Sequence, residues 1–308
     1  MVFENLSPKI RKAIKKRGFV SPTEIQKLAI PKILKGKNVL LIAPTGTGKS
    51  EGAWLPIFHK FLKQKKKRGI NILHITPLRA LNRDLIERIQ FWAEELDIDA
   101  QVRHGDTTQH QRRKQALESP SLLVTTPETL NAILPGSRMK EHLSHVKYVV
   151  VDEIHSFAGD KRGAHLSIAL ERLRELAGDF QLIGLSATVG SPERVAKFLV
   201  GAEREVEVVQ IPATKNMKLS VESPPITKLD KRKSNDLMAS PSAVARVRRI
   251  HELANEHKSS LIFVNTRHGV ELLSLRMRLY DESFPFSAHH SSLSKDSRIG
   301  AERKFKNG

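Results

Sequence analysis

The chain has 308 residues, of which 52 are Lys or Arg and 33 are Asp or Glu, so its formal net charge is +19 at pH 7. It has no cysteine, which excludes disulfides and thiolate zinc sites, and no apolar run approaches the roughly 20 residues of a membrane span, so we expect no membrane partner. The excess of positive charge favours a polyanionic partner; nucleic acid is the class we expect, and an acidic protein is the alternative.

The N-terminal stretch, up to about residue 37, has helical spacing and no signal-peptide core, so we expect a cytoplasmic protein. Ser7 followed by Pro8 predicts the start of one helix, and Ser21 followed by Pro22 predicts the start of another.

Between residues 38 and 190, short apolar segments alternate with helical patterns. The expected strands are NVLLIA, INILHIT, AQVR, SLLVTT, VKYVVVD and QLIGLSA, and the expected helices lie near 76–96, 107–118, 127–134 and 163–177. Strands this apolar are typical of a parallel sheet covered by helices on both faces. The predicted fold class is therefore α/β, an open doubly wound parallel sheet. Trp54 and Trp92 fall on apolar helical faces, and we expect both in the core.

After about residue 190 the pattern changes. VEVVQIPATKNMKLSVE predicts two short strands, and SPPITKLDKRKSND predicts a mobile linker. The order helix, strand, helix, strand, helix from residue 241, with strands at SLIFVN and FPFSAHH, predicts the beginning of a second α/β domain. We therefore expect a first domain over 1–205, a strand pair and linker over 206–240, and part of a second domain over 241–308, in a fragment of a longer protein.

The strand NVLLIA runs into a glycine loop, APTGTGKS, that departs from the phosphate-loop pattern G-x-x-x-x-G-K-[ST] only at its first position. Its two glycines let backbone N–H groups curl around phosphate oxygens, and the following helix points its positive end at them. We expect the lysine to neutralise phosphates and the serine to bind Mg²⁺, the alternative being a Gly-rich turn with an incidental lysine. The candidate ATP-binding residues here are Ala43, Pro44, Thr45, Gly46, Thr47, Gly48, Lys49 and Ser50.

Asp152 and Glu153 follow the apolar strand at VKYVVVD. In an open α/β sheet, ligands bind beyond the carboxyl ends of the strands, so we expect both acids near the glycine loop. Asp152 is the candidate for holding Mg²⁺ through water, and Glu153 for orienting or deprotonating the attacking water. Together with Lys49 they are the predicted catalytic residues; a solvated turn is the alternative for the two acids.

APTGTGKS, DEIH and SAT resemble motifs of the superfamily-two DExH-box helicases, whose catalytic domains have a RecA-like fold. GFVSPTEIQ resembles the Q motif of that family, which implies adenine recognition by Gln26 and stacking by Phe19. The position of His155 beside Glu153 indicates that it links the nucleotide state to SAT, with an inert exposed histidine as the alternative. The coupling candidates are His155, Ser186, Ala187 and Thr188.

TPLRALNRDL resembles motif Ia, TTPETL resembles motif Ib, and LIFVNTR resembles motif IV, which begins a second RecA-like domain in the family. Motifs Ia and Ib face the nucleic-acid backbone in the family. A plain turn at Gly105 and helix capping by Thr126 and Pro127 are the alternatives at those positions. The candidate nucleic-acid contacts are Pro77, Arg79, Gly105, Thr126, Pro127, Asn265, Thr266, Arg267 and His290.

VVVDEIHSFAGDKRGAHLSIALERL, GLSAT and HHSSLSKDSR resemble the Lhr (large helicase-related) group, which consists mostly of archaeal and bacterial DNA-unwinding ATPases. Ser291 departs from the HHGSLS that is more frequent in that group. Motif V and motif VI, with its arginine fingers, would follow residue 308.

The resemblance implies a monomeric ATP-dependent helicase or translocase that uses ATP and Mg²⁺ and acts on DNA or RNA, as a single strand with a duplex junction. One alternative is a nucleotide- and nucleic-acid-binding module without efficient turnover. The other is an unrelated phosphate-loop enzyme, such as a kinase.

Overall fold

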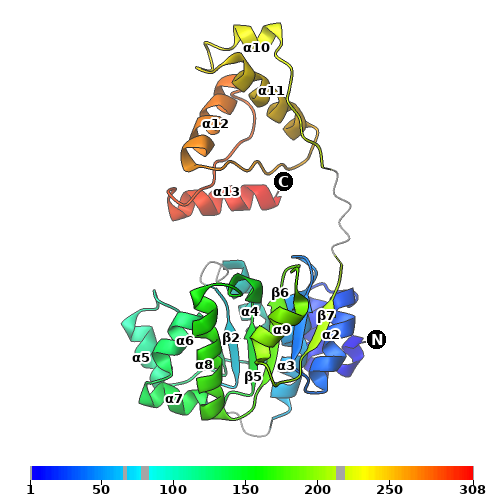
Figure 1. Ribbon diagram of the computed structural model, residues 1–308, viewed down its shortest axis with the longest axis vertical. Helices are drawn as coiled ribbons and strands as arrows, with labels where there is room; N and C mark the ends of the chain where they lie inside the picture. The colour runs from blue at the N-terminus through cyan, green and yellow to red at the C-terminus, as the bar shows by residue number, and fades with distance from the viewer. Residues whose placement is uncertain (1, 65–67, 78–82, 213–218, 308) are drawn as a thin grey trace. The chain divides into compact units, whose positions relative to one another are not determined.

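The computed structural model describes residues 2–64, 68–77, 83–212 and 219–307 (Figure 1). The chain forms two compact units, Met1–Lys215 and Asn216–Gly308. The segment 206–240, predicted as strand pair and linker, is therefore divided between them.

A parallel sheet forms the middle of the first unit, and all its pairings are parallel. The order of its strands is β3-β4-β2-β5-β6-β1-β7. This arrangement confirms the predicted α/β fold and six predicted strands. The strands are β1 (Val39–Ile42), β2 (Ile72–Ile75), β3 (Ala100–Arg103), β4 (Leu122–Thr125), β5 (Tyr148–Val151), β6 (Gln181–Ser186) and β7 (Glu207–Gln210).

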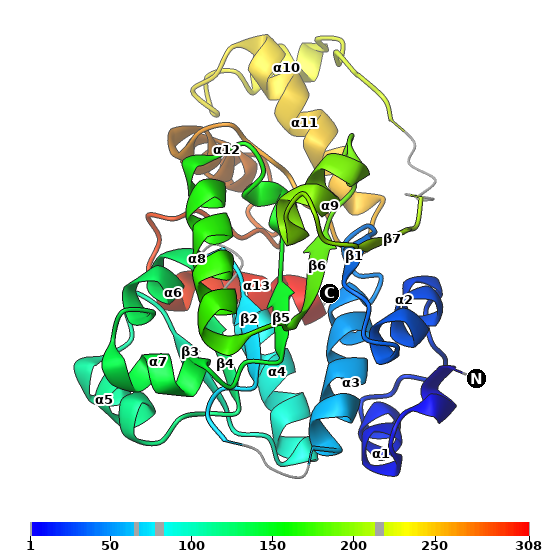
Figure 2. The same ribbon diagram turned by 60° about the horizontal axis from the view of Figure 1, so that its bottom comes forward.

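Helices cover both faces of this sheet (Figure 2). One face packs on α1 (Pro8–Lys16), α2 (Glu24–Leu34), α3 (Lys49–Leu62) and α4 (Arg83–Leu96). Trp54 and Trp92 are buried in this layer, which confirms their predicted place in the core. The opposite face packs on α6 (Pro127–Ile133), α7 (Ser137–Leu143), α8 (Lys161–Ala177) and α9 (Pro192–Val200). The remaining helical elements are η1 (Val2–Asn5), α5 (Gln109–Leu117) and η2 (Ile154–Ser156).

One local prediction in the first unit is wrong, and another is tested only in part. Helix α2 begins at Glu24 rather than at Pro22, because Thr23 is its N-cap and forms a capping box with Gln26. Of the two strands expected in VEVVQIPATKNMKLSVE, the structure shows β7; residues 213–218 lie outside the described part of the chain. Helices α7 and α9 were not among the predicted elements.

The second unit consists of helices α10 (Lys228–Arg232), α11 (Pro241–Asn255), α12 (Arg267–Tyr280) and α13 (Lys295–Asn307). Its small core contains Leu237, Val244, Val247 and Met277. Strands were predicted at SLIFVN and FPFSAHH, but no strand occurs within residues 219–307. A strand needs a neighbouring strand for its backbone hydrogen bonds. Without one, the first of these segments forms no regular element and leaves Phe263 90% exposed.

The predicted mobile linker also contains ordered structure. Thr227 caps α10 in a capping box with Asp230, whose carboxylate is fully buried. Arg248 on α11 donates from Nε to Oδ1 of Asp230 at 3.0 Å, which ties α10 to α11. Burial raises the pKa of Asp230, but hydrogen bonds from Arg248 and Thr227 outweigh it, so the net pKa is lowered. A charged segment is ordered here because its acid is paired and buried.

Replacing Asp230 by Ala is expected to destabilise the second unit by about 3 kcal/mol, because it leaves the Arg248 guanidinium without its buried partner. Hydrogen exchange of the α10 and α11 amides should accelerate by roughly 100-fold. The matched control is Asp236→Ala, at an exposed site, which should leave exchange unchanged. The folded-state pKa is lowered, so this stabilisation is complete above the unfolded pKa of about 3.9 and is lost as pH falls through the folded value. Equal exchange in both variants would contradict the structural role of Asp230.

Candidate nucleotide site

The predicted ATP-site residues come together at the carboxyl edge of the sheet. The loop after β1 provides the glycine segment, the end of β5 provides the two acids, and the end of β6 provides SAT. These three strands are direct neighbours, in the order β5-β6-β1. Since parallel strands end on the same side of a sheet, residues far apart in sequence meet here.

The glycine loop has a conformation that its glycines make possible. Gly46 and Gly48 have φ of +78° and +82°, a region that costs other residues about 1 kcal/mol. Gly48 is the N-cap of α3, so the first turn of that helix opens toward the loop. A Cβ on Gly48 would lie 2.4 Å from Nε2 of Gln26. The loop thus needs glycine for both its φ and its close neighbour.

Gln26, the candidate from the Q motif, holds the loop from α2. Its Nε2 donates to the Gly48 carbonyl at 3.1 Å, and its Oε1 accepts from the backbone N–H of Thr23 at 3.1 Å. Phe19, the other Q-motif candidate, is half-buried, and its ring packs against Trp92 with centroids 6.2 Å apart. Adenine recognition by these two residues remains a prediction.

Lys49 lies at the centre of the candidate site, on the first turn of α3. Its Nζ donates to the carbonyls of Ala43 and Pro44 at 2.6 and 2.9 Å. Burial lowers the pKa of Lys49, while the nearby carboxylates of Glu153 and Asp152 raise it. The ammonium therefore lies between the loop and the two acids, where a phosphate would meet it.

The two acids at the end of β5 have environments unlike that of a solvated turn. Burial raises the pKa of Asp152, and burial together with the charge of Asp152 raises that of Glu153. Glu153 has φ of +49°, which is rare for a residue with a side chain and recurs at functional sites. The Glu153 N–H donates to Oδ1 of Asp152 at 2.9 Å. A carboxylate with a raised pKa is better suited to accept a proton.

His155 connects Glu153 to the SAT segment. Its Nδ1 accepts from the backbone N–H of Ala187 at 3.3 Å and lies 3.3 Å from Oγ of Ser186. Because Nδ1 accepts, Nε2 carries the proton in the neutral ring, and it lies 3.1 Å from Oε2 of Glu153. Thr188, the last coupling candidate, is exposed. His155 thus contacts Glu153 on one side and Ser186 and Ala187 on the other. That these contacts couple the nucleotide state to SAT remains a prediction.

The residues at this site fit a magnesium ion bound together with a nucleotide. Mg²⁺ in phosphoryl-transfer sites takes one or two protein oxygens, with substrate phosphates and water completing the shell. Ser50 supplies a hydroxyl and Asp152 a carboxylate, and Lys49, next to Ser50, is close enough to Asp152 for each charge to shift the other's pKa. In the described part of the chain, no three His, Cys, Asp or Glu side chains gather as a metal site; nucleotide phosphates and water are the usual further ligands of Mg²⁺.

The predicted nucleic-acid residues of the first unit follow β2, β3 and β4. These strands also end at the carboxyl edge of the sheet, next to β5. Pro77 is buried at the end of β2, and Arg79 lies outside the described residues. Gly105 is exposed in the turn after β3, and its carbonyl accepts from Arg112 at 2.6 Å. Thr126 caps α6, and Pro127 is its first residue. The capping role, predicted as an alternative, is thus present there.

The candidates of the second unit lie around the start of α12. Thr266 is the N-cap of this helix and accepts from the Gly269 N–H at 3.0 Å. Arg267 donates to Oγ of Ser292 at 2.9 Å, which joins the helix start to the HHSSLS segment. Asn265 precedes the cap and is exposed. Oε1 of Glu271, on the same helix, pairs with Nε2 of His290.

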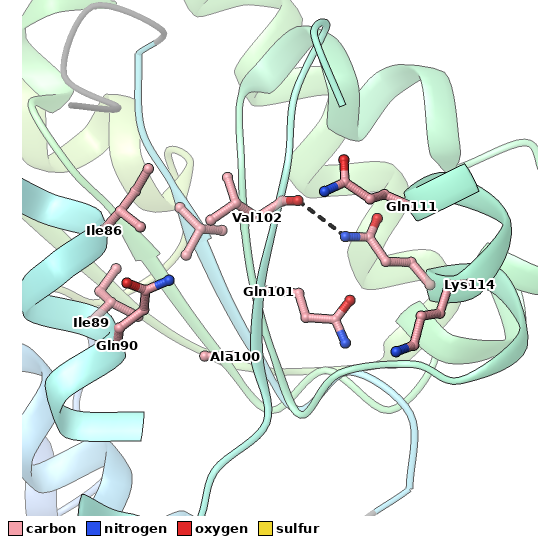
Figure 3. Close-up of a pocket in the computed structure, with 10 residues that line it drawn as sticks. Ile86, Ile89, Gln90, Ala100, Gln101, Val102, Gln111 and Lys114 are labelled. Carbon is pink, nitrogen blue, oxygen red and sulfur yellow. Dashed lines mark hydrogen bonds between the residues drawn. The ribbon is translucent and has the colours of Figure 1, made fainter. Parts of the chain in front are cut away.

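A hollow in the first unit lies beside the edge strand β3, between α4, β3 and α5 (Figure 3). Four strands separate β3 from β1 in the sheet, so this hollow is not the nucleotide site. Gln115 donates from Nε2 to the Val102 carbonyl at 3.0 Å and thereby occupies part of the free edge of β3.

Comparison with known proteins tests the family predicted from the sequence motifs. A family model described as DEAD/DEAH box helicase matches residues 23–196. The chain belongs to the DEAD/DEAH box helicase family. The matched region contains the glycine loop, the two acids and SAT, so the predicted family is confirmed on the residues that carried the prediction.

Within the DEAD/DEAH box family, the chain is similar to Lhr helicases. It is 39% identical to the ATP-dependent helicase Lhr-Core of Methanothermobacter thermautotrophicus over 95% of this chain and 36% of that protein. It is 36% identical to Lhr-Core protein 2 of Thermococcus barophilus, over 100% of this chain and 37% of that protein. The predicted likeness to the Lhr group is confirmed, and the chain spans little more than a third of these relatives.

Among solved structures, Mycobacterium smegmatis helicase Lhr bound to ssDNA and AMP-PNP matches with a TM-score of 0.79 and 34% identity. The match covers 99% of this chain and 41% of that one. The DEAD-box helicase Mss116 bound to ssRNA and UDP-BeF has a TM-score of 0.74 at 19% identity, which supports the RecA-like fold alone. Across the described residues, no helix has both the length and the apolar character needed to cross a bilayer.

Some residues beside the site were not singled out by the sequence. His74 is buried in β2 and lies 3.8 Å from Asp152, and Arg88 on α4 pairs with the buried Glu51 on α3. A histidine inside the otherwise apolar strand ILHI was the available signal. The pairing of Arg88 with Glu51 has no sequence signal, because 37 residues separate them.

Proposed function

We propose that the chain binds MgATP and hydrolyses it as the ATP-binding part of a helicase that moves along DNA. The observation that carries this proposal is the convergence of Lys49, the two acids and SAT at the ends of three neighbouring strands. The matching Lhr structure was solved with ssDNA and AMP-PNP, which supports DNA and ATP as the ligands here.

Each residue of the site then has a defined role. Lys49 donates to the phosphate oxygens, the backbone N–H groups of the loop surround them, and Ser50 with Asp152 holds Mg²⁺. Mg²⁺ held there would supply positive charge beside the transferring phosphoryl group. Glu153 orients the attacking water and accepts its proton. His155 contacts both Glu153 and the SAT backbone, so a movement of one is transmitted to the other.

The nucleic acid is proposed to bind along the ends of β2, β3 and β4, beside the nucleotide site. The net charge of +19 supports a polyanionic ligand. Helix starts such as that of α6, with Thr126 and Pro127, supply backbone N–H groups suited to phosphate oxygens. We propose that a monomer binds single-stranded DNA next to a duplex junction, with RNA as the alternative strand.

The proposal is tested by ATP hydrolysis measured with and without nucleic acid. We expect single-stranded DNA to accelerate hydrolysis, and equal lengths of RNA in parallel assays decide between the two polymers. If no nucleic acid changes the rate and none binds, the assignment as a translocase is wrong.

A second candidate function is a nucleotide- and nucleic-acid-binding module with little turnover. It uses the same binding residues as the first proposal and differs from it in the rate of turnover. The test compares this chain with the full-length Methanothermobacter relative and with that relative cut to the matching region. Tight binding of both ligands with turnover only in the full-length relative would support the module.

Binding of single-stranded DNA is expected to depend steeply on salt. Each phosphate contact on a single strand contributes about −0.7 to the slope of log K against log salt, so about five contacts would weaken binding about 100-fold between about 50 and 200 mM salt. Fluorescence anisotropy with a labelled oligonucleotide measures this slope. A strand of the same sequence with uncharged methylphosphonate links is the matched control and should bind weakly with little salt dependence. A flat response of the natural strand would contradict a phosphate-based interface.

A further inference from the structure

His74 lies where the strands that lead to the nucleotide site meet the strands that lead to the predicted nucleic-acid contacts. It lies on β2, which pairs with β4 on one side and with β5 on the other. The register places His74 beside Val150, so Asp152, two residues further along the chain and directly after β5, follows on the same side. The imidazole is 1% exposed. It is thus a buried polar group on the strand that precedes motif Ia, beside the strand that DEIH follows.

The hydrogen bonds of the imidazole fix its tautomer. Nε1 of Trp54 donates to Nδ1 of His74 at 3.3 Å. An indole N–H can only donate, so Nδ1 accepts and the proton of the neutral ring is on Nε2. Burial, and then the charge of Arg88, lower the pKa of His74 to about 3, so the ring is neutral at physiological pH.

The protonated nitrogen faces Asp152. Nε2 of His74 lies 3.8 Å from Oδ2 of Asp152, and within the described residues it has no hydrogen-bond partner. A buried donor without a partner costs about 1–3 kcal/mol, so its retention calls for an explanation. The other oxygen of Asp152, Oδ1, already accepts from the Glu153 N–H. His74 is therefore placed to fix the one carboxylate oxygen that the backbone leaves free.

Trp54 packs in turn against a partly buried ion pair. The Arg88 guanidinium lies 5.3 Å from the centre of the Trp54 ring, and it donates to both carboxylate oxygens of Glu51 at 2.8–3.2 Å. Glu51 follows Ser50 on α3, and Arg88 is on α4, the helix after motif Ia. A continuous series of side-chain contacts therefore runs from α4 through α3 to His74 on β2, which faces Asp152.

We infer that His74 is a positioning residue for Asp152: held in one tautomer by Trp54, it directs its Nε2–H at Oδ2 from 3.8 Å and, once nucleotide and magnesium bind, donates to that oxygen and orients the carboxylate. The inference rests on the proposed function, because it takes Asp152 as the carboxylate that binds the ion through water. Second-layer hydrogen bonds of this kind commonly set the affinity of a site for its metal. The rival explanation is that His74 only fills space in the core.

The test is the affinity of the 308-residue chain for a fluorescent ADP analogue, measured with Mg²⁺ and with EDTA. The ratio of the two affinities isolates the contribution of the ion. In His74→Leu we expect this ratio to fall about tenfold, with the affinity in EDTA unchanged. His74→Gln keeps an N–H donor and should retain more of the ratio than His74→Leu.

A second pair of variants keeps the test independent of the folding of His74→Leu. Trp54→Phe removes the indole N–H that fixes the tautomer and should lower the ratio. Trp92→Phe is the matched control, since Trp92 is equally buried on the same face and its Nε1 has no hydrogen-bond partner within the described residues. This variant should leave the ratio unchanged, whatever it does to the melting temperature.

The outcomes separate the inference from the function on which it rests. If the wild-type chain shows no magnesium-dependent gain in affinity, the proposed nucleotide site itself is wrong. If the wild-type chain shows the gain, Asp152→Asn loses it, and folded His74→Leu and Trp54→Phe keep it, then His74 is only a core residue. An equal fall in Trp54→Phe and Trp92→Phe would also overturn the inference.

Discussion

Glu153→Gln is expected to slow ATP hydrolysis by about 10²–10⁴-fold while nucleotide affinity stays close to that of the wild-type chain. The amide has nearly the same shape as the carboxylate and can still accept the Nε2–H of His155, which lies 3.1 Å away. It cannot accept a proton from the attacking water. The change therefore removes the chemical role of Glu153 and leaves its packing in place.

The measurement pairs steady-state hydrolysis in the presence of single-stranded DNA with equilibrium binding of a fluorescent nucleotide. Glu94→Gln, on the exposed surface of α4, is the control for the chemical change itself and should alter neither. Loss of binding in Glu153→Gln would assign this side chain to holding the nucleotide. A hydrolysis rate equal to that of the wild-type chain would show that Glu153 does not take part in the reaction.

The parallel sheet and the glycine loop could be predicted because local sequence determines them. Each of the central strands is buried on both faces, so it appears in the sequence as an uninterrupted apolar run such as VLLI. The loop is recognisable because its backbone needs glycine at 46 and 48, where φ is positive. The meeting of Lys49 with Asp152 and Glu153 then followed from the rule that parallel strands end on one side.

The second unit was harder to predict because its order depends on contacts between distant residues. Asp230 appears in a charged segment typical of a linker, and only its pairing with Arg248, 18 residues later, makes burial of the segment favourable. The opposite error occurred at SLIFVN, which has strand composition. Composition does not make a strand without a neighbour to pair with, and Leu261 and Phe263 there are exposed.

His74 shows a third kind of limit. A histidine in a strand has no predicted partner in the sequence, since the indole that fixes its tautomer is on α3 and the carboxylate it faces directly follows β5. Its significance depends on three side chains meeting at one point. Sequence spacing alone gives no distance between them.

Lys49→Ala is expected to weaken nucleotide binding by about 10- to 100-fold, because one hydrogen bond to a charged group contributes about 1.5–3 kcal/mol. Hydrolysis should fall further, since negative charge on the phosphates increases as the bond to the leaving group breaks. The Nζ group now donates to the carbonyls of Ala43 and Pro44, so it is already inside the curve of the loop.

Lys60→Ala is the matched control, because Lys60 is on the same helix and is also partly buried, but its Nζ donates to Gln181 instead of the loop. Burial lowers the pKa of both lysines, so the two variants remove ammonium groups from comparable environments. Lys49→Ala should lose nucleotide affinity with little change in melting temperature, whereas Lys60→Ala should keep the affinity. Equal affinity in the two variants would show that Lys49 does not contact phosphate, and the glycine loop would then have only a structural role.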